Sequence, residues 1–485
     1  MVPPYPASGA AARLCHSLPM EHEHPSREGS IDELWESVSG PVLVPGDPDF
    51  APTVQPWNLA ISQQPSAAVV AHDPRDVSEA VRAAAAIGLP VAVQATGHGV
   101  GAVADGALLI VTSQLRDVHM DPVARTARVG AGVLWSEVVL QAQDVGLVPL
   151  MGSSPNVGAV GYTLGGGVGW LARRYGLACD SVRSLDVVTA DGERRTVSAT
   201  EQPDLFWALR GAGPAGLAVV LGMEIDLFPV IAGYGGNLVY PPELAGEVLR
   251  RYRGWIADAP EELTSSVALM NLPPLDIIPE PLRGQSWVMV RGLHCGETAN
   301  AEALLSYWRD WRQPAMDMFG EMPMSLIATV SNDPEGPLPG VSTGAVLGAL
   351  TDDAVETLLS HAFPKAGRAP FVQVEVRHLG GATARPPQVP SAFDGRDVEL
   401  LLQAVAMLPD PQMRPAVDAA VGALQTAIEP YATGRTYLNF LEGEEKVRSA
   451  QRSFTPETLA RLAEVKRVYD PAGLFRFGLD VSGAG

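Results

Sequence analysis

The sequence is poor in basic charge. It has 34 Lys and Arg against 55 Asp and Glu, which gives a formal net charge of −21 over 485 residues. Without a basic stripe to neutralise phosphate groups, a nucleic-acid partner is not expected. The same acidic balance argues against adhesion to an anionic membrane surface.

Cysteine and long apolar runs are also scarce. The three cysteines, Cys15, Cys179 and Cys295, are far apart and odd in number, which excludes a disulfide framework and a CxxC metal motif. The N-terminus lacks the pattern of a secretory signal, and apolar runs such as 217–222 are too short to span a bilayer. We therefore expect a cytoplasmic protein without membrane contacts, either a monomer or a homo-oligomer.

The length and the 46% hydrophobic content predict at least two lobes. We divide the chain into an N-terminal extension with a short helix capped by Ser30 (1–50), a first lobe (51–230), a second lobe (231–430) and a C-terminal segment that returns to the first lobe (431–485). His22 and His24 lie in a polar tail, where solvated histidines are the expectation, so no metal site is predicted.

Strands and helices alternate through the first lobe. The pattern predicts a helix over 74–87 introduced by Asp73, and a hairpin over 182–199 with Asp191-Gly192 as its turn. In the second lobe it predicts strands over 263–270, 287–293 and 372–378 with helices between them.

Two glycine-rich stretches stand out, over 90–101 and 158–169. Small residues let backbone N–H groups approach an anion closely, so two such stretches predict a large phosphate-bearing cofactor. In the first stretch His98 stands between Gly97 and Gly99. The second stretch fits the G-x-G-x-x-G dinucleotide fingerprint poorly, and the sequence contains no P-loop, G-x-S-x-G or HExxH motif.

Several motifs in one order resemble a known family. They are QPWN, GHGVG, GLVPLMGSSPNVGAVGYTLGGGVGWLARRYGLACDSV, LDVVTADG, PDLFWALRG, YLNF and YDPAGLF. The chain resembles FAD-linked oxidases of the vanillyl-alcohol-oxidase fold, in the berberine bridge enzyme-like branch. The resemblance implies an α+β, two-lobe PCMH-type FAD-binding fold, in which the central substrate domain is an antiparallel sheet covered by helices.

The resemblance also implies that the flavin is attached covalently to His98, which raises its oxidising power and prevents its loss. Many relatives form a second link through a cysteine, where this chain has Ser154, so we expect a single link. The residues expected to bind FAD are His98, Ala95, Thr96, Gly97, Gly99, Val100, Gly158, Ala159, Gly161, Tyr162, Gly165, Gly166, Gly169 and Asn439.

Four positions bear on the chemistry that the family would perform here. Val157 stands where a small residue admits O₂ in relatives, although an ordinary packed valine is an equal alternative. Tyr162 replaces a histidine that contacts the flavin. Val168 stands where some sugar-oxidising relatives have a tyrosine, and Phe440 replaces a second tyrosine in the YLNF motif.

The candidate catalytic residues are Tyr437, Glu375 and Arg377. Alternation along the strand over 372–378 places Glu375 and Arg377 on one face together with Gln373, though a plain surface ion pair would give the same pattern. Tyr437 is the first candidate for an acid, a base or an orienting phenol. A group of methionines (Met316, Met318, Met322 and Met324) could line an apolar pocket, but core packing is the favoured interpretation.

The resemblance implies hydride transfer from a small alcohol, sugar, amine or secondary metabolite to FAD, with O₂ reduced to H₂O₂. Two alternatives remain open at this point. One is a dehydrogenase of the same fold that uses another electron acceptor, and the other is a flavin-binding protein without turnover.

Overall fold

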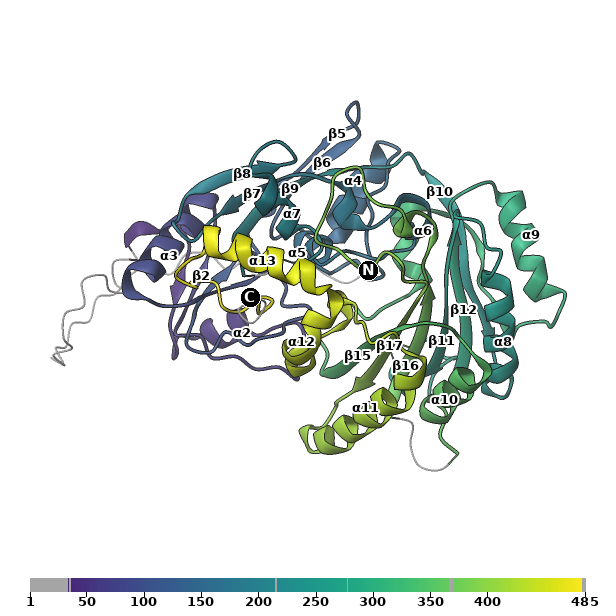
Figure 1. Cartoon of the computed structure of the whole chain (residues 1–485). Coiled ribbons are helices and arrows are strands. Elements are labelled where there is room, and N and C mark those ends of the chain that lie inside the picture. The colour runs from purple at the N-terminus through teal and green to yellow at the C-terminus, as the bar shows by residue number, and fades with distance from the viewer. Residues whose placement is uncertain (1–33, 35, 214–215, 277, 366–369, 482–485) are drawn as a thin grey trace.

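The computed structural model describes residues 34, 36–213, 216–276, 278–365 and 370–481. The predicted helix after Ser30, together with Cys15, His22 and His24, lies outside these residues apart from a few positions at its end. Three sheets make up two lobes that lie side by side in Figure 1, with two sheets in the first lobe and one large sheet in the second.

The first sheet has the order β1-β2-β4-β3 (β1, Val42–Leu43; β2, Ala67–Val70; β3, Val91–Gln94; β4, Leu108–Val111). Strands β2, β4 and β3 are parallel, and most of their residues are buried, as expected for strands covered on both faces. Helix α3 (Pro74–Ile87) begins after Asp73, whose carboxylate accepts the N–H groups of Arg75 and Asp76, and it ends at Gly88 with φ +69°. The predicted bounds of this helix are confirmed.

The second sheet is antiparallel, with the order β5-β6-β9-β7-β8 (β5, Val118–Asp121; β6, Thr126–Gly130; β7, Val182–Val188; β8, Arg194–Ser198; β9, Val219–Asp226). Strands β7 and β8 form the predicted hairpin. The helices of this lobe are α2 (Phe50–Val54), α4 (Trp135–Asp144), α5 (Ala159–Leu164), α6 (Ala172–Tyr175), η1 (Ala178–Ser181) and α7 (Pro203–Leu209).

The third sheet is also antiparallel and has eight strands, in the order β13-β10-β12-β11-β16-β17-β15 with β14 paired to β10. The strands are β10 (Ala232–Tyr240), β11 (Leu263–Asn271), β12 (Ser286–His294), β13 (Met316–Asp317), β14 (Gly320–Pro323), β15 (Gly340–Leu347), β16 (Phe371–His378) and β17 (Leu400–Met407). Strands β11, β12 and β16 match the predicted ones, whereas β10, β15 and β17 were not predicted individually.

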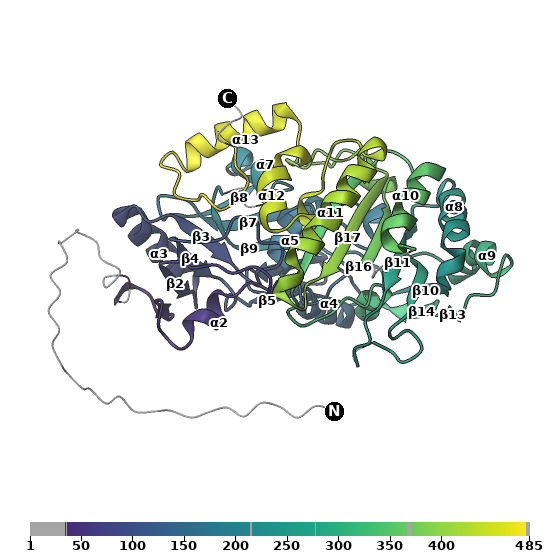
Figure 2. The ribbon, with the colours of Figure 1, turned by 90° about the horizontal axis from the view of Figure 1, so that it is seen from below.

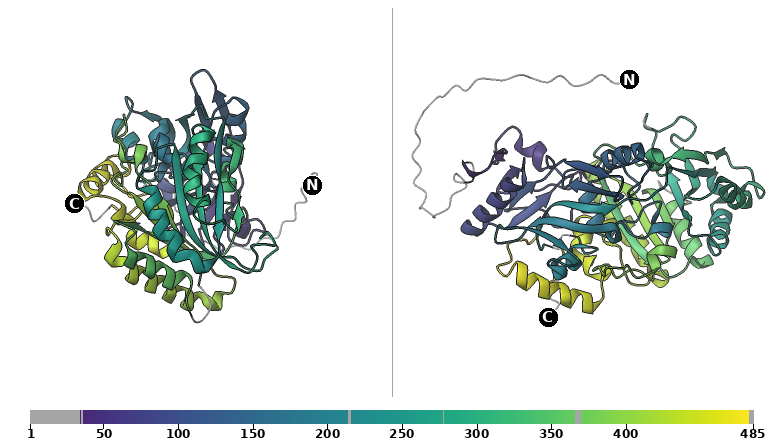
Figure 3. Two further views of the ribbon diagram at one scale, coloured as in Figure 1. Left: turned by 90° about the vertical axis from the view of Figure 1, so that its right-hand side faces the viewer. Right: turned by 90° about the horizontal axis from the view of Figure 1, so that it is seen from above.

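Four helices cover one face of the large sheet, namely α8 (Ala245–Ile256), α9 (Thr298–Arg309), α10 (Asp352–Ala362) and α11 (Arg414–Ile428). Figure 3 shows these helices along the outer side of the sheet. Their apolar side chains and those of the strands share one core that includes Trp308, Tyr252 and Phe371. The opposite face of the sheet, which these helices leave uncovered, lies toward the first lobe.

The C-terminal segment lies against the first lobe (Figure 2). Helix α13 (Pro456–Tyr469) packs against α7, where Arg461 lies 3.8 Å over the Trp207 ring and pairs with Asp204. Further along, the Val91 N–H of β3 donates to Leu474 O at 2.9 Å. The segment also contains α12 (Gly443–Ser449). The remaining short helices are η2 (Pro242–Leu244), η3 (Met324–Val330), η4 (Gly381–Ala384), η5 (Pro411–Met413), η6 (Glu429–Tyr431), η7 (Leu438–Phe440) and η8 (Ala450–Ser453).

None of the helices in the described part of the chain combines the length and the apolar character needed to cross a bilayer. The described residues also contain no group of three or more His, Cys, Asp or Glu side chains that could hold a metal ion.

Candidate active site

A cavity of about 1470 Å³ lies between the lobes. Single ligand pockets are typically about 300–1,000 Å³, so this cavity has room for a dinucleotide together with a small substrate. One side, here called the loop wall, is formed by residues 91–102, 152–162 and 437–447. The opposite side, here called the sheet wall, is formed by side chains of the large sheet, among them Arg291, Gln373, Arg377 and Gln403.

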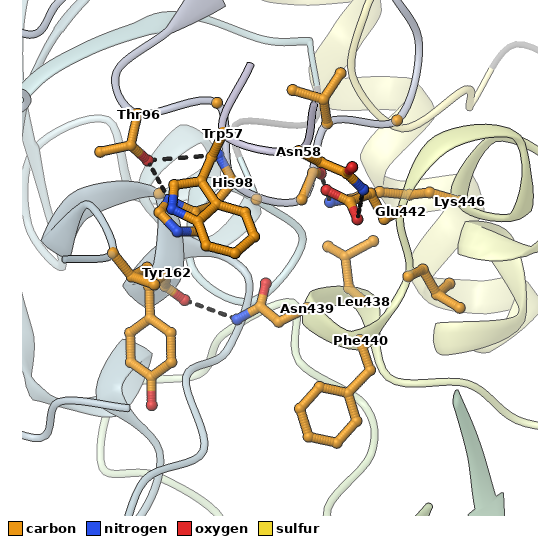
Figure 4. A pocket seen from close by; sticks show the side chains of 18 of the residues that line it. Trp57, Asn58, Thr96, His98, Tyr162, Leu438, Asn439, Phe440, Glu442 and Lys446 are labelled. Carbon is orange, nitrogen blue, oxygen red and sulfur yellow. Dashed lines mark hydrogen bonds between the residues drawn. The ribbon is translucent and has the colours of Figure 1, made fainter. Parts of the chain in front are cut away.

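His98 lies on the loop wall and is held on two sides (Figure 4). Its ring stacks on Trp57 with centroids 4.6 Å apart, and its Nδ1 is 2.8 Å from the Thr96 hydroxyl. Burial lowers the pKa of His98 to about 4. The imidazole is therefore neutral at physiological pH, with its position fixed by two neighbours.

The backbone around His98 needs its glycines. Gly97 has φ +74°, and a Cβ there would lie 2.6 Å from the Pro56 Cα. Gly99 also has a positive φ, +62°. Only glycine adopts such angles at little cost, so this loop can bring its backbone close to a ligand.

The C-terminal segment is hydrogen-bonded to the same loop. Lys446 Nζ donates to Gly99 O at 2.7 Å, and the Gly443 N–H donates to Val100 O at the same distance. Burial lowers the pKa of Lys446 to about 8. Burial also raises the pKa of Glu442, whose carboxylate accepts from Asn58 Nδ2 at 2.7 Å. Sequence analysis assigned no role to Lys446 or Glu442, although Asn58 belongs to the QPWN motif.

Only part of the second glycine-rich stretch, residues 158–169, lines the cavity. Gly158, Gly161 and Tyr162 line the cavity, as do the predicted residues 95–100. Ala159, Gly165, Gly166 and Gly169 are not among the lining residues. A Cβ at Gly165 would lie 1.9 Å from Asn439 Oδ1, and one at Gly169 would lie 1.8 Å from Met151 O. These two glycines therefore serve close packing behind the cavity.

Tyr437 and Asn439 line the cavity at the junction of the two walls. Asn439 Nδ2 donates to Tyr162 O at 2.9 Å and to the Tyr437 hydroxyl at 3.2 Å. The Tyr437 hydroxyl also accepts the N–H groups of Gly167 and Val168 at 3.0 and 3.1 Å. Burial raises the pKa of Tyr437 despite these donors, so its phenol is protonated and its own hydrogen remains available.

Tyr162 does not share this network through its phenol. Its hydroxyl is buried and has no hydrogen-bond partner among the described residues. Burial raises its pKa well above the ordinary value. The hydroxyl lies close to Gly152 and Gly169 and points away from His98 (Figure 4).

On the sheet wall, Gln373, Glu375 and Arg377 lie on one face of β16, as predicted. Glu375 Oε2 accepts from Arg377 Nε at 2.8 Å and from Gln373 Nε2 at 3.2 Å. Glu375 is 0% exposed, so the alternative of a plain surface ion pair is wrong. It lies behind the lining, whereas Arg377 and Gln373 reach the cavity. Burial by itself raises the pKa of Glu375, but Arg377 and Arg291 outweigh it and hold the pKa below its usual value.

Val157 and Ser154 both line the cavity. The Ser154 hydroxyl donates to Asn156 Oδ1 at 2.6 Å, as a turn-capping serine would. None of the cysteines in the described part of the chain lines the cavity. The methionines Met316, Met318, Met322 and Met324 are absent from the lining too, and Met324 is fully buried in the core.

Comparison with known proteins agrees with this geometry. Residues 65–198 match the family described as FAD binding domain, and residues 436–481 match the family described as berberine and berberine like. The chain is 27% identical over 470 residues to (R)-6-hydroxynicotine oxidase of Paenarthrobacter nicotinovorans, covering 93% of this chain and 98% of that protein. It is 24% identical over 488 residues to a carbohydrate oxidase of Microdochium nivale, covering 93% and 94%.

Among solved structures, the fold is similar to that of Physcomitrella patens BBE-like 1, with a TM-score of 0.81 at 20% identity, covering 93% of this chain and 99% of that one. The fold, the two family matches and the relatives define an FAD-linked oxidoreductase with the α+β, two-lobe PCMH-type fold. Within that class, the chain is similar to the berberine bridge enzyme-like proteins, and the matched FAD binding domain indicates FAD as the cofactor.

The cavity fits this cofactor. It offers the volume, a glycine loop that lines the cavity, and the His98 ring, which Trp57 and Thr96 hold in place. The residues that would hold FAD are those of the loop wall, above all Trp57, residues 95–100, Gly158 and Asn439.

Proposed function

We propose that the protein is an FAD-dependent oxidase whose flavin is attached covalently through His98 alone. When bound, FAD supplies a two-electron acceptor, so that the substrate loses a hydride and a proton and O₂ becomes H₂O₂. Residues 51–230 and 431–485 would hold the cofactor, and residues 231–430 would supply the substrate side.

The observation that carries the proposal is the state of His98. A covalent link requires a neutral imidazole with a free ring nitrogen facing the cofactor space. Burial keeps His98 neutral, Thr96 contacts Nδ1, and Trp57 fixes the ring plane at the cavity. A second link is not supported, because Ser154 carries a hydroxyl where a thioether would need a thiol.

The side chains near the substrate space are suited to orienting the substrate rather than to acting as a strong base. Tyr437 is protonated and lines the cavity, so we assign it the role of a hydrogen-bond donor to the substrate. Glu375 does not reach the cavity, and it acts as a positioning residue that fixes Arg377. Arg377 in turn lies 5.1 Å over the Phe440 ring, which places its charge at the cavity edge.

The substrate is a small molecule with an apolar part. Val168 stands where some sugar-oxidising relatives have a tyrosine, and Phe440 replaces a second tyrosine of the family's tail motif. On the sheet side, Met270, Leu272 and Val405 line the cavity. These residues favour an alcohol, an amine or a secondary metabolite over a polyhydroxylated sugar. Val157 on the loop wall would leave O₂ a route to the flavin.

The test is acid precipitation of the purified protein, followed by mass analysis of its peptides. Yellow colour in the pellet and FAD mass on the His98 peptide are expected, and both should vanish in His98→Ala but persist in Ser154→Ala. Flavin found wholly in the supernatant of the wild type would overturn the covalent link. Peroxide release under air then tests the oxidase, because slow reoxidation of the reduced flavin by O₂ would indicate a dehydrogenase.

A further inference from the structure

Arg291, on β12, is a buried cation with unused hydrogen-bonding capacity. It is 3% exposed and lines the cavity. Its Nε has no partner among the described residues, and its Nη2 contacts only the sulfur atoms of Met270 and Met289, at 3.6 and 3.9 Å. A thioether is a weak acceptor. Its Nη1 donates to Glu375 Oε1 at 3.3 Å and to Gln373 Oε1 at 3.5 Å. The Nε–H and the two Nη2–H groups of this guanidinium therefore lack a good partner.

The nearest carboxylate is shared. Glu375 Oε1 lies 3.3 Å from Arg291 Nη1 but 2.7 Å from the Ser266 hydroxyl, and Glu375 Oε2 is taken by Arg377 at 2.8 Å. The register of the sheet explains this arrangement, because Ser266 pairs with Arg291 on one side and with Arg377 on the other. Glu375 therefore lies between two guanidinium groups.

One carboxylate cannot neutralise two guanidinium groups. Asp333, which also lines the cavity, raises the pKa of Arg377 after Glu375, so the second negative charge serves Arg377. The described residues form no other ion pair with Arg291 within 4 Å. Two carboxylates thus balance the two guanidinium charges, but the Nε–H and Nη2–H groups of Arg291 still lack good acceptors. Such a buried site favours a ligand that supplies acceptor oxygens.

We propose that Arg291 binds an anionic oxygen group of the substrate, of the carboxylate class, while Met270 and Leu272 contact an apolar body beside it. The guanidinium fork matches the two oxygens of a carboxylate, and the low-dielectric surroundings strengthen the pair. This inference rests on the proposed function, since it places a substrate on the sheet wall. It narrows that substrate to an amphipathic organic acid.

The test uses the flavin-loaded protein and two probes of equal shape, phenylacetate and the neutral phenylacetamide, with affinities measured by calorimetry. We expect phenylacetate to bind about 10- to 100-fold more tightly, the range for a hydrogen bond to a charged group. Arg291→Met should remove this preference, and Arg291→Lys should keep part of it, because the charge stays while the fork is lost. Arg385→Gln, which breaks an exposed ion pair with Glu261, should leave both affinities unchanged.

The proposal is overturned if the wild type binds phenylacetate no more tightly than phenylacetamide, whether both bind or neither does. It is equally overturned if Arg291→Met keeps the preference. Should Arg291→Met fail to fold, the wild-type comparison and Arg291→Lys still decide. The calorimetric measurement detects binding without turnover. Its failure is therefore distinct from failure of the oxidase proposal, which is tested by peroxide release and by mass analysis of the His98 peptide.

Discussion

The two walls of the cavity are built in different ways. The loop wall is built mainly from two glycine-rich segments, 91–102 and 152–162, with His98 in the first of them, and the C-terminal segment 437–447 completes it. The sheet wall consists of polar and apolar side chains from five strands, β11, β12, β15, β16 and β17, whose neighbours are set by pairing across the sheet. Under the proposed function, cofactor binding would depend largely on local backbone shape, whereas substrate binding would depend on the register of the large sheet.

The largest expected effect is on the loop wall. Gly97→Ala combines a left-handed backbone angle with a Cβ 2.6 Å from Pro56 Cα, and should cost about 3–5 kcal/mol of stability and most of the FAD. Gly106→Ala is the matched control, since Gly106 has φ +70° but open space around a Cβ. It should cost only about 1–2 kcal/mol and keep its flavin. Chemical denaturation measures the stability of each variant, and the flavin-to-protein ratio after gel filtration measures its FAD content. Equal losses in the two variants would refute the role of the close contact between residue 97 and Pro56.

On the sheet wall, Glu375→Gln leaves two buried guanidinium groups without their carboxylate. We expect a loss of about 3–5 kcal/mol in the free energy of unfolding. The control is Glu261→Gln, which removes an exposed pair with Arg385 and should cost below about 1 kcal/mol. Urea denaturation compares them, and a small effect at Glu375 would mean that the arginines do not depend on it.

Tyr437→Phe probes the junction of the walls. It removes the acceptor of the buried Gly167 and Val168 N–H groups, which should cost about 1–3 kcal/mol. In Tyr240→Phe the lost hydroxyl is buried without a partner among the described residues, so we expect almost no cost. Thermal unfolding tests stability, and a fall in kcat for peroxide release would support the donor role. Unchanged kcat in Tyr437→Phe would argue against it.

A further, pH-dependent effect concerns the contact between the C-terminal segment and the loop wall. The pKa of Lys446 is about 8, below its ordinary 10.5, so between these values the unfolded chain binds more protons than the folded one. Its contribution to the free energy of unfolding therefore rises as pH increases from about 8 to 10.5. Lys446→Met should flatten this rise, while Lys365→Met at an exposed position should not. Denaturation midpoints from pH 7 to 10.5 measure it, and identical slopes in wild type and Lys446→Met would contradict the assignment.

Parts of the fold could be predicted because their signals are local. Helix α3 was predicted with the right bounds from Asp73 and the pattern of residues 74–87, because a helix cap acts within one turn of the chain; in the structure Gly88 ends the helix. The β7–β8 hairpin followed from its turn dipeptide. Strands β10, β15 and β17 were not predicted individually, because they carry no comparable marker and form through partners distant in sequence.

The same division applies to the candidate site. The sequence by itself indicated the family resemblance, the glycine loop around His98 and the shared face of Gln373, Glu375 and Arg377, because each depends on neighbouring residues or on the two-residue period of a strand. Only the tertiary structure decided that Lys446 grips that loop, that Gly165 serves packing, and that Arg291 lies beside Glu375. These contacts join segments up to hundreds of residues apart, and their geometry exists only once the sheets have paired.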